Sequence, residues 1–374
     1  FIPIADIMAL PYSELDGLFY RLHLWIIDGK FYAIFSMLFG AGFGLQYLKN
    51  RDRLDTFLPV YRRRLAFLLA FGVLHALFWS GDILTLYALL AFVMVLLREL
   101  TRPQVLLLVV ALLSFFLLPQ LLMMLFGPEA APPAALARKV YPDVTPAEVA
   151  AAFGAGNWSD VFIMNLHNLY WRWMDFFPNG RISRVLGLFM LGFYLVRSRY
   201  FREQVCRFHW IVVWGVLGIA TTYAAMALGA NLSRWATDWV DLLAKMLSVV
   251  GQVTLALAYM SVVGFLYENV VGRWLLHPLT LIGRMAFTNY LMQSVIGVFI
   301  FYGIGLGQFG SLGLAQLWLL ALAIYAGQVL FSSLWLRLFK QGPVEWLWGC
   351  LTKQRWTANR KFLLSGADET KGAA

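Results

Sequence analysis

Long apolar stretches separated by short polar turns dominate the pattern of this chain. Runs of roughly 17 to 25 mostly apolar residues are typical of membrane-spanning helices. We identify about nine such runs, at residues 30–48, 62–79, 82–98, 104–126, 183–197, 207–229, 243–266, 281–304 and 314–338. Connections between the early runs are short, so we expect neighbours in sequence to pack as antiparallel hairpins. The pattern predicts an all-α fold, a polytopic transmembrane helical bundle, with residues 1–374 forming a single integral membrane domain.

Composition strengthens the assignment to a membrane. Hydrophobic residues make up 61% of the chain and charged residues only 13%, with a mean hydropathy of +0.69. A soluble globular domain is nearer a quarter charged. Aromatic residues account for 16%, including 15 Trp, and such side chains favour the boundary between lipid and water. The lipid bilayer is therefore the first partner that the sequence predicts.

Basic residues gather on one side of the predicted bundle. They crowd the loop between the first two runs and recur near residues 98–102, 197–207 and 340–361. Because Lys and Arg are enriched in cytoplasmic loops, we predict that this side, with a C-terminal tail at 340–374, faces the cytoplasm of a bacterial inner membrane. The net charge of +10 then reflects topology and contact with anionic lipid. Nucleic-acid binding is not expected, since no basic patch lies on a soluble domain.

The same topology places residues 1–28 outside the cytoplasm. The opening FIPIADIMALP has neither an initiator Met nor the charged start of a signal peptide, so we expect a preceding helix to be missing. Cys206 and Cys350 fall on the cytoplasmic side, where disulfides are rare, and we expect free thiols. The five histidines are dispersed and do not predict a metal site.

His75 and Asp82 are the strongest candidates for chemistry. They lie seven residues apart where two apolar runs meet at a Trp-Ser-Gly turn. Ionisable groups beside hydrocarbon are costly and are functional candidates by default. Each also has a structural explanation, because Asp82 could cap the next helix and His75 could bond to a carbonyl. As a pair, the carboxylate could fix the tautomer of an imidazole that accepts a proton from an attacking hydroxyl or amine.

Lys30 precedes a glycine-rich run, FGAGFG, within the first apolar stretch. Gly40, Gly42 and Gly44 fit close helix approach better than a phosphate cradle, which needs a strand–loop–helix context. Lys30 could snorkel to the interface or line a cavity.

The segment GRMAFTNYLMQS, residues 283–294, places Asn289 and Gln293 on one helix face. Amides inside a bundle either hold helices together or line a cavity, and both interpretations stay open. Arg284 at the helix start would suit a phosphate-bearing ligand. Gln252, on the preceding run, shares a face with other polar residues, so we expect a polar cavity between these two runs.

Residues 127–182 form the long outer segment. Within it, FIMNLHNLYWRWMDFF repeats apolar residues at helical spacing, which predicts an amphipathic helix lying on the outer leaflet. The alternative is an acceptor platform, because aromatic faces beside Asn, His167 and Arg172 suit sugars.

Four segments resemble, in order, the hallmark motifs of the YeiB-like proteins (domain of unknown function 418), over about residues 30–353. They are KFYAIFSMLFGAGF, YRRRLAFLLAFGVLHALFWSGDILTLYALL, GRMAFTNYLMQS and QGPVEWLWG. The family's opening helix, with its LDxxRG-type motif, is absent. The family is grouped by distant similarity with transmembrane acyltransferases. The resemblance implies transfer of an acyl group, acetyl from acetyl-CoA, to an extracytoplasmic small-molecule or glycan acceptor. The family's His and Gly-Asp motifs fall on His75, Gly81 and Asp82.

Our hypothesis is that His75 acts as general base or accepts the acyl group, and that Asp82 orients it. The phosphates of an acyl-CoA donor would be attracted by Arg62, Arg63, Arg64 and Arg284, about 30 Å away across the hydrocarbon. The route between the faces would be lined by Lys30, Gln252, Asn289 and Gln293. A secondary transporter in which His75 relays protons and a membrane protein without turnover are the alternatives, and assembly into a homo-oligomer stays open.

Overall fold

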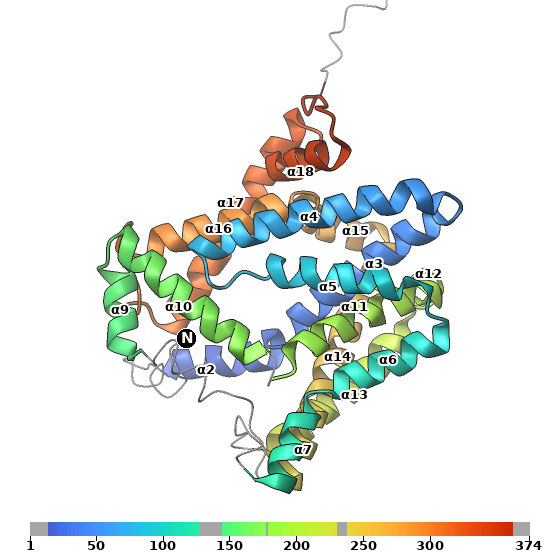
Figure 1. Cartoon of the computed structure of the whole chain (residues 1–374), viewed down its shortest axis with the longest axis horizontal. Helices are drawn as coiled ribbons and strands as arrows, with labels where there is room; N and C mark the ends of the chain where they lie inside the picture. The colour runs from blue at the N-terminus through green and yellow to red at the C-terminus, as the bar shows by residue number, and fades with distance from the viewer. Residues whose placement is uncertain (1–13, 128–143, 177–178, 230–237, 362–374) are drawn as a thin grey trace, which may run out of the picture.

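The computed structural model describes residues 14–127, 144–176, 179–229 and 238–361. All regular elements of these residues are helices, apart from one isolated β-bridge between Phe339 and Arg360. Figure 1 shows the helices stacked side by side. The predicted all-α bundle is confirmed. Residues 1–11, 128–143 and 362–374, on which parts of the terminal and outer-segment predictions fall, lie outside the described residues.

The first half of the bundle runs from α2 to α7. Its helices are α2 (Glu14–Leu22), the π-helical turn η1 (His23–Ile27), α3 (Lys30–Lys49), α4 (Leu54–Phe78), α5 (Leu84–Leu96), α6 (Arg102–Ser114) and α7 (Leu117–Phe126). The outer segment and second half hold α9 (Pro146–Gly154), α10 (Trp158–Phe176), α11 (Arg181–Arg197), α12 (Tyr200–Glu203), α13 (Phe208–Leu228), α14 (Trp239–Glu268), α15 (Val270–Arg284), α16 (Ala286–Phe301), α17 (Leu314–Leu338) and α18 (Pro343–Lys353).

A helix occupies each predicted run, but fewer helices qualify as spans than we expected. Four described helices are long and apolar enough to cross a membrane, at Glu14–Lys49, Phe208–Leu228, Trp239–Glu268 and Leu314–Leu338. The pair α6 and α7, bent by 50°, makes a fifth if it is one span. Helices α5, α11 and α16 have only 13, 17 and 16 residues. They reach roughly 20–26 Å, less than the hydrocarbon thickness of about 30 Å.

The centre of the fold is the crossing of α3 and α11, where two glycines let the backbones touch. A Cβ on Gly40 would lie 1.9 Å from the carbonyl oxygen of Phe189, and one on Gly192 would lie 1.9 Å from that of Met37. Gly44 also packs, against Phe193. The predicted packing role is therefore confirmed for Gly40 and Gly44. It is wrong for Gly42, which faces open space.

Pairing of neighbours follows the prediction only in part. Helices α4 and α5 pack together, as do α13 and α14, whereas α3 packs mainly on α11. The run predicted at 281–304 also divides, because α15 ends at Arg284 and α16 begins at Ala286. Fully buried Met285 lies at this break.

The C-terminal helix α18 joins the two helices that carry the site. It packs on α4, and its Glu345 carboxylate accepts backbone N–H bonds from Phe287 and Thr288 in the first turn of α16, at 2.7 and 3.0 Å. A carboxylate at this position satisfies N–H groups that have no partner inside the helix. Through α18, the middle of α4, at Arg63 and Arg64, is connected to the start of α16.

Candidate functional site

His75, Asp82 and Ser294 form a chain of hydrogen bonds. Nδ1 of His75 lies 2.9 Å from Oδ1 of Asp82, and Nε2 lies 2.9 Å from Oγ of Ser294. His75 is 9% exposed and Asp82 is 6% exposed. His75 comes from the last turn of α4, Asp82 from the following connection and Ser294 from the middle of α16. The predicted His–Asp contact therefore exists, and a hydroxyl completes it.

Asp82 is held as a carboxylate in the connection between α4 and α5. Its oxygens accept N–H bonds from Leu84 at 3.1 Å and Thr85 at 2.8 Å, so the expected cap of the second helix is present. Burial alone would raise the pKa of this carboxyl, but the hydrogen bonds from His75 and Thr85 outweigh burial and hold the pKa below its ordinary value. Because a carboxylate only accepts, His75 donates from Nδ1 and leaves Nε2 to accept the Ser294 hydroxyl proton.

Sequence reasoning does not single out Ser294. The available signal was its position at the end of the segment GRMAFTNYLMQS, four residues after Tyr290 on the same helix face. The ring of Tyr290 lies 5.1 Å from that of His75, and its hydroxyl accepts the Ile83 N–H at 3.3 Å. Both residues therefore lie on the face of α16 toward His75, whereas Asn289 and Gln293 lie on an adjacent face that contacts α17.

Helix α10 fixes the turn that carries Asp82. The fully buried Asn165 donates to the Phe78 carbonyl at 2.8 Å and accepts the Ser80 N–H at 3.4 Å. Arg172 donates to the Ser80 carbonyl at 2.5 Å. The predicted helix in the outer segment is present, and these two polar side chains face the protein. Asn165 is thus a positioning residue for the turn.

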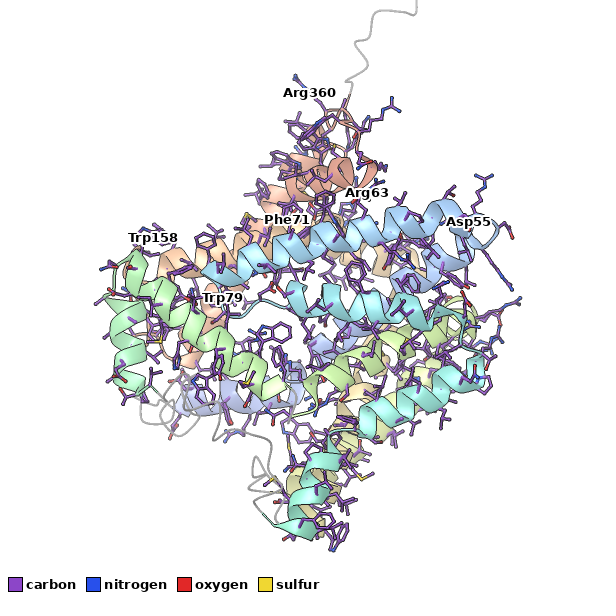
Figure 2. The ribbon with its side chains drawn as sticks, viewed as in Figure 1. Asp55, Arg63, Phe71, Trp79, Trp158 and Arg360 are labelled. Carbon is purple, nitrogen blue, oxygen red and sulfur yellow. The ribbon has the colours of Figure 1, made fainter. Side chains whose placement is uncertain are left out.

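An apolar groove of about 470 Å³ opens beside His75 and Ser294. Apart from these two polar residues, its lining is mainly aliphatic and aromatic, including Phe71, Leu74, Phe78, Trp79, Val295 and Phe299. Figure 2 marks Phe71 and Trp79, and also Trp158 of α10, at this end of α4. The apolar lining suits a bound hydrocarbon chain whose polar end lies at His75 and Ser294.

Three of the predicted donor-binding arginines, Arg62, Arg63 and Arg64, lie near the middle of α4, and the fourth, Arg284, ends α15. Arg63 donates to the Thr352 carbonyl at 2.6 Å, and the Arg64 guanidinium stacks 4.1 Å from the Trp348 ring centre. Arg284 donates to the Lys340 carbonyl at 3.1 Å, while Arg62 is exposed. Three of the four therefore hold the C-terminal residues. Thirteen helical residues separate Arg62 from His75, so the distance is about 20 Å rather than the expected 30 Å.

The four predicted cavity residues do not line one cavity, and only Asn289 and Gln293 lie in the same cluster. Lys30 is buried and donates to the Leu24 carbonyl at 2.6 Å. Asn289 donates to Ser332 at 3.0 Å and Gln293 to Gln328 at 2.8 Å, which joins α16 to α17 and supports the interpretation as helix–helix contacts. Gln252 instead lines a second cavity, between α14 and the α10–α11 region. The expected grouping of Gln252 with Asn289 and Gln293 is not found.

Sequence comparison agrees with this architecture. The family model described as "Protein of unknown function (DUF418)" matches residues 195–355. YxaH of Bacillus subtilis (strain 168) is 32% identical over 361 residues, which cover 92% of this chain and 84% of the relative. YeiB of Escherichia coli (strain K12) is 30% identical over 345 residues, covering 86% and 81%. No solved structure matches the chain significantly.

Fold and composition together define a polytopic helical membrane protein. Within that class, the chain belongs to the YeiB-like DUF418 family. The matched family segment contains Ser294 but begins after His75 and Asp82, so the hydrogen-bonded chain joins residues inside and outside it.

Proposed function

We propose that this protein is a membrane acyltransferase in which Asp82, His75 and Ser294 act as one proton-transfer chain. The observation that supports it most directly is the order of carboxylate, imidazole and hydroxyl, with both contacts at 2.9 Å. This order activates a weak hydroxyl nucleophile, because the carboxylate fixes the imidazole tautomer and the imidazole removes the proton.

The proposed reaction has two balanced halves. In the first, Ser294 Oγ attacks the acyl carbonyl of a thioester while its proton moves to His75 Nε2. The thiolate that leaves takes that proton, and the acyl group remains as an ester on Ser294. In the second half, an acceptor hydroxyl gives its proton to Nε2 and attacks the ester. Collapse of this adduct returns the proton to Ser294 Oγ and releases the acylated acceptor.

The apolar groove gives the acyl chain a place to lie during both halves. Its lining meets the polar pair at His75 and Ser294, so a chain in the groove would present its carbonyl to the hydroxyl. We propose acyl-CoA as the donor, with acetyl as its smallest acyl group, and a small molecule or glycan as the acceptor. A donor whose phosphates contact Arg62 would have to extend its acyl arm along about 20 Å of α4.

The test is to trap the ester on the full chain. The protein, purified in lipid nanodiscs, is incubated with acetyl-CoA and with a longer acyl-CoA, then digested and mapped by mass spectrometry. We expect an acyl adduct on Ser294 that is lost in His75→Ala and Ser294→Ala. The control Ser159→Ala, which changes an exposed serine, should keep it.

Each other outcome has a defined meaning. Acyl transfer without an adduct, retained by Ser294→Ala but lost in His75→Ala, would show that His75 activates the acceptor directly. Retained transfer by His75→Ala would refute the mechanism. Accumulation of a labelled substrate in vesicles without any donor would instead indicate a transporter.

A further inference from the structure

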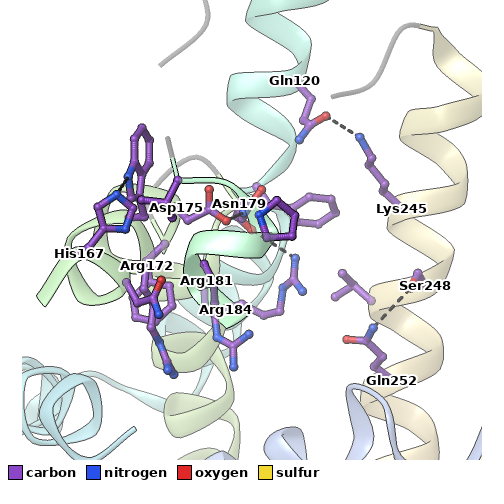
Figure 3. A pocket seen from close by; sticks show the side chains of 18 residues that line it. Gln120, His167, Arg172, Asp175, Asn179, Arg181, Arg184, Lys245, Ser248 and Gln252 are labelled. Atoms are coloured by element: carbon purple, nitrogen blue, oxygen red, sulfur yellow. Dashed lines mark hydrogen bonds between the residues drawn. The ribbon is translucent and has the colours of Figure 1, made fainter. Parts of the chain in front are cut away.

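A second cavity, of about 670 Å³, lies between α10, the start of α11 and α14. Figure 3 shows three arginines on one side of it, Arg172, Arg181 and Arg184, with Lys245 of α14 on the other. Among the described residues that line it, Asp175 supplies the one carboxylate, and this carboxylate accepts a hydrogen bond from the Asn179 amide at 2.8 Å. The lining is therefore rich in positive charge.

The three guanidiniums gather without carboxylate partners. Within the described part of the chain, none of them has a carboxylate oxygen within 4.0 Å. Arg172 and Arg181 face the same ring, with centroid distances of 5.2 and 5.7 Å to Phe176. Arg184 lies 5.2 Å from the Phe116 ring, and its buried Nε has no hydrogen-bond partner. Arg172 and Arg184 are half-buried and Arg181 is exposed, and like charges held this close without a counter-charge repel one another.

The start of α11 adds further positive potential. Gly180 has φ +61°, and a Cβ there would lie 2.4 Å from Phe116 Cβ, so only glycine allows the chain to turn into α11 here. Arg181 and Arg184 then fall in the first turn, where the helix dipole disfavours cations. Burial, and to a smaller extent the charge of Arg181, lowers the pKa of Arg172 to about 10. An anion in the cavity would relieve each of these costs.

We propose that this cavity binds a phosphate-type oxyanion carried by a ligand with further polar groups. Guanidiniums bind such oxyanions through paired N–H donors, and the exposed N–H groups of a helix start complete an anion site. The amides of Asn168 and Gln252 lie on the same lining and supply hydrogen bonds for hydroxyl groups beside the phosphate. The site is distinct from the proton-transfer chain, although Arg172 also holds the turn before Asp82, so the variants that test it leave Arg172 unchanged.

Two probes distinguish the source of the anion. Binding of inorganic pyrophosphate to the full chain in phosphatidylcholine nanodiscs tests a water-borne phosphate, at constant ionic strength. Nanodiscs of phosphatidylcholine with and without phosphatidylglycerol, compared by thermal unfolding, test a lipid headgroup. We expect at least one probe to stabilise the native protein.

Charge variants localise the effect. In Arg181→Gln/Arg184→Gln we expect binding to weaken by about tenfold or more, since each lost charged hydrogen bond costs roughly that factor. The matched control Arg102→Gln/Arg273→Gln removes two exposed arginines and should bind like wild type. Arg181→Lys/Arg184→Lys keeps the charge and should restore part of the affinity, which excludes simple misfolding. Absence of stabilisation by both probes, or equal loss in the control, would overturn the proposal.

Discussion

The Ser294 hydroxyl lies 2.9 Å from His75 Nε2, although 219 residues separate the two in the chain. The contact joins α16 to the end of α4, and Glu345 of α18 caps the start of that same α16. A histidine that could have been an ordinary interface residue is therefore hydrogen-bonded on both ring nitrogens. Asp82 has two roles, because it contacts His75 and also accepts N–H bonds at the start of α5, and mutation can separate them.

Asp82→Asn should remove activity while keeping the helix cap. Asn caps helices about as well as Asp, but its side chain would no longer fix His75 as the Nδ1–H tautomer. In the Ser-His-Asp template this change lowers kcat about 10⁴-fold, and we expect a loss of similar size. Asp82→Ala should lose activity and also about 1 kcal/mol of stability. Acyl-transfer rates and denaturant unfolding of both variants check this, and unchanged transfer in Asp82→Asn would contradict it.

Acid should destabilise the wild-type protein through Asp82. The pKa of this carboxyl is lowered in the folded state from its ordinary value of 3.8, so the fold favours the ionised form. The resulting stability is fully present above the unfolded pKa and is lost as the pH falls through the folded pKa. Unfolding free energies of wild type and Asp82→Asn, measured from pH 7 to pH 3, should converge below about pH 4. A difference that is independent of pH would exclude this source.

Filling the groove should select against long acyl groups. Val295 is 68% exposed on its wall, and Val295→Trp would occupy space that a chain needs. We expect transfer of a long acyl group to slow by about tenfold or more, with acetyl transfer nearly unchanged. Leu319→Trp, at a 65% exposed position of α17, is the matched control. Equal slowing of both donors in Val295→Trp would argue against the groove as the acyl site.

The crossing of α3 and α11 should not tolerate a methyl group at Gly192. The added Cβ would lie 1.9 Å from the Met37 carbonyl oxygen, so the helices must separate, at a cost of about 1–3 kcal/mol. Gly42→Ala is the control, because its Cβ meets nothing within 4 Å and alanine favours a helix by about 1 kcal/mol. Thermal unfolding in detergent should lower the midpoint only for Gly192→Ala, and a wild-type midpoint for that variant would count against the crossing.

Local patterns predicted the helices and one contact of the site. Apolar run lengths located the helices, and the spacing of His75 and Asp82 across a turn indicated their pairing. Both features depend on residues close in sequence. Fewer described helices than the nine predicted runs are long and apolar enough to span a membrane, in part because α5, α11 and α16 have only 13 to 17 residues.

Contacts between distant segments could not be predicted in the same way. Nothing local indicates that Ser294 meets His75, that Arg63 bonds to Thr352 or that Asn165 holds the turn before Asp82. These pairings depend on which helices pack together, and the glycines at the α3–α11 crossing show how backbone approach decides that. The basic cavity was missed although Arg172, Arg181 and Arg184 are close in sequence, because its opposite wall, with Lys245 and Gln252, comes from α14.

The groove beside His75 has a kinetic consequence. Its wall residues Leu74, Phe78, Val295 and Phe299 are 56%, 52%, 68% and 57% exposed, so in a bilayer they face lipid tails rather than water. A molecule that reaches the hydroxyl by this path first partitions into the membrane. The reaction rate would then follow the mole fraction of that molecule in the bilayer or micelle. Added detergent would slow the reaction by surface dilution, even at a constant bulk concentration of the molecule.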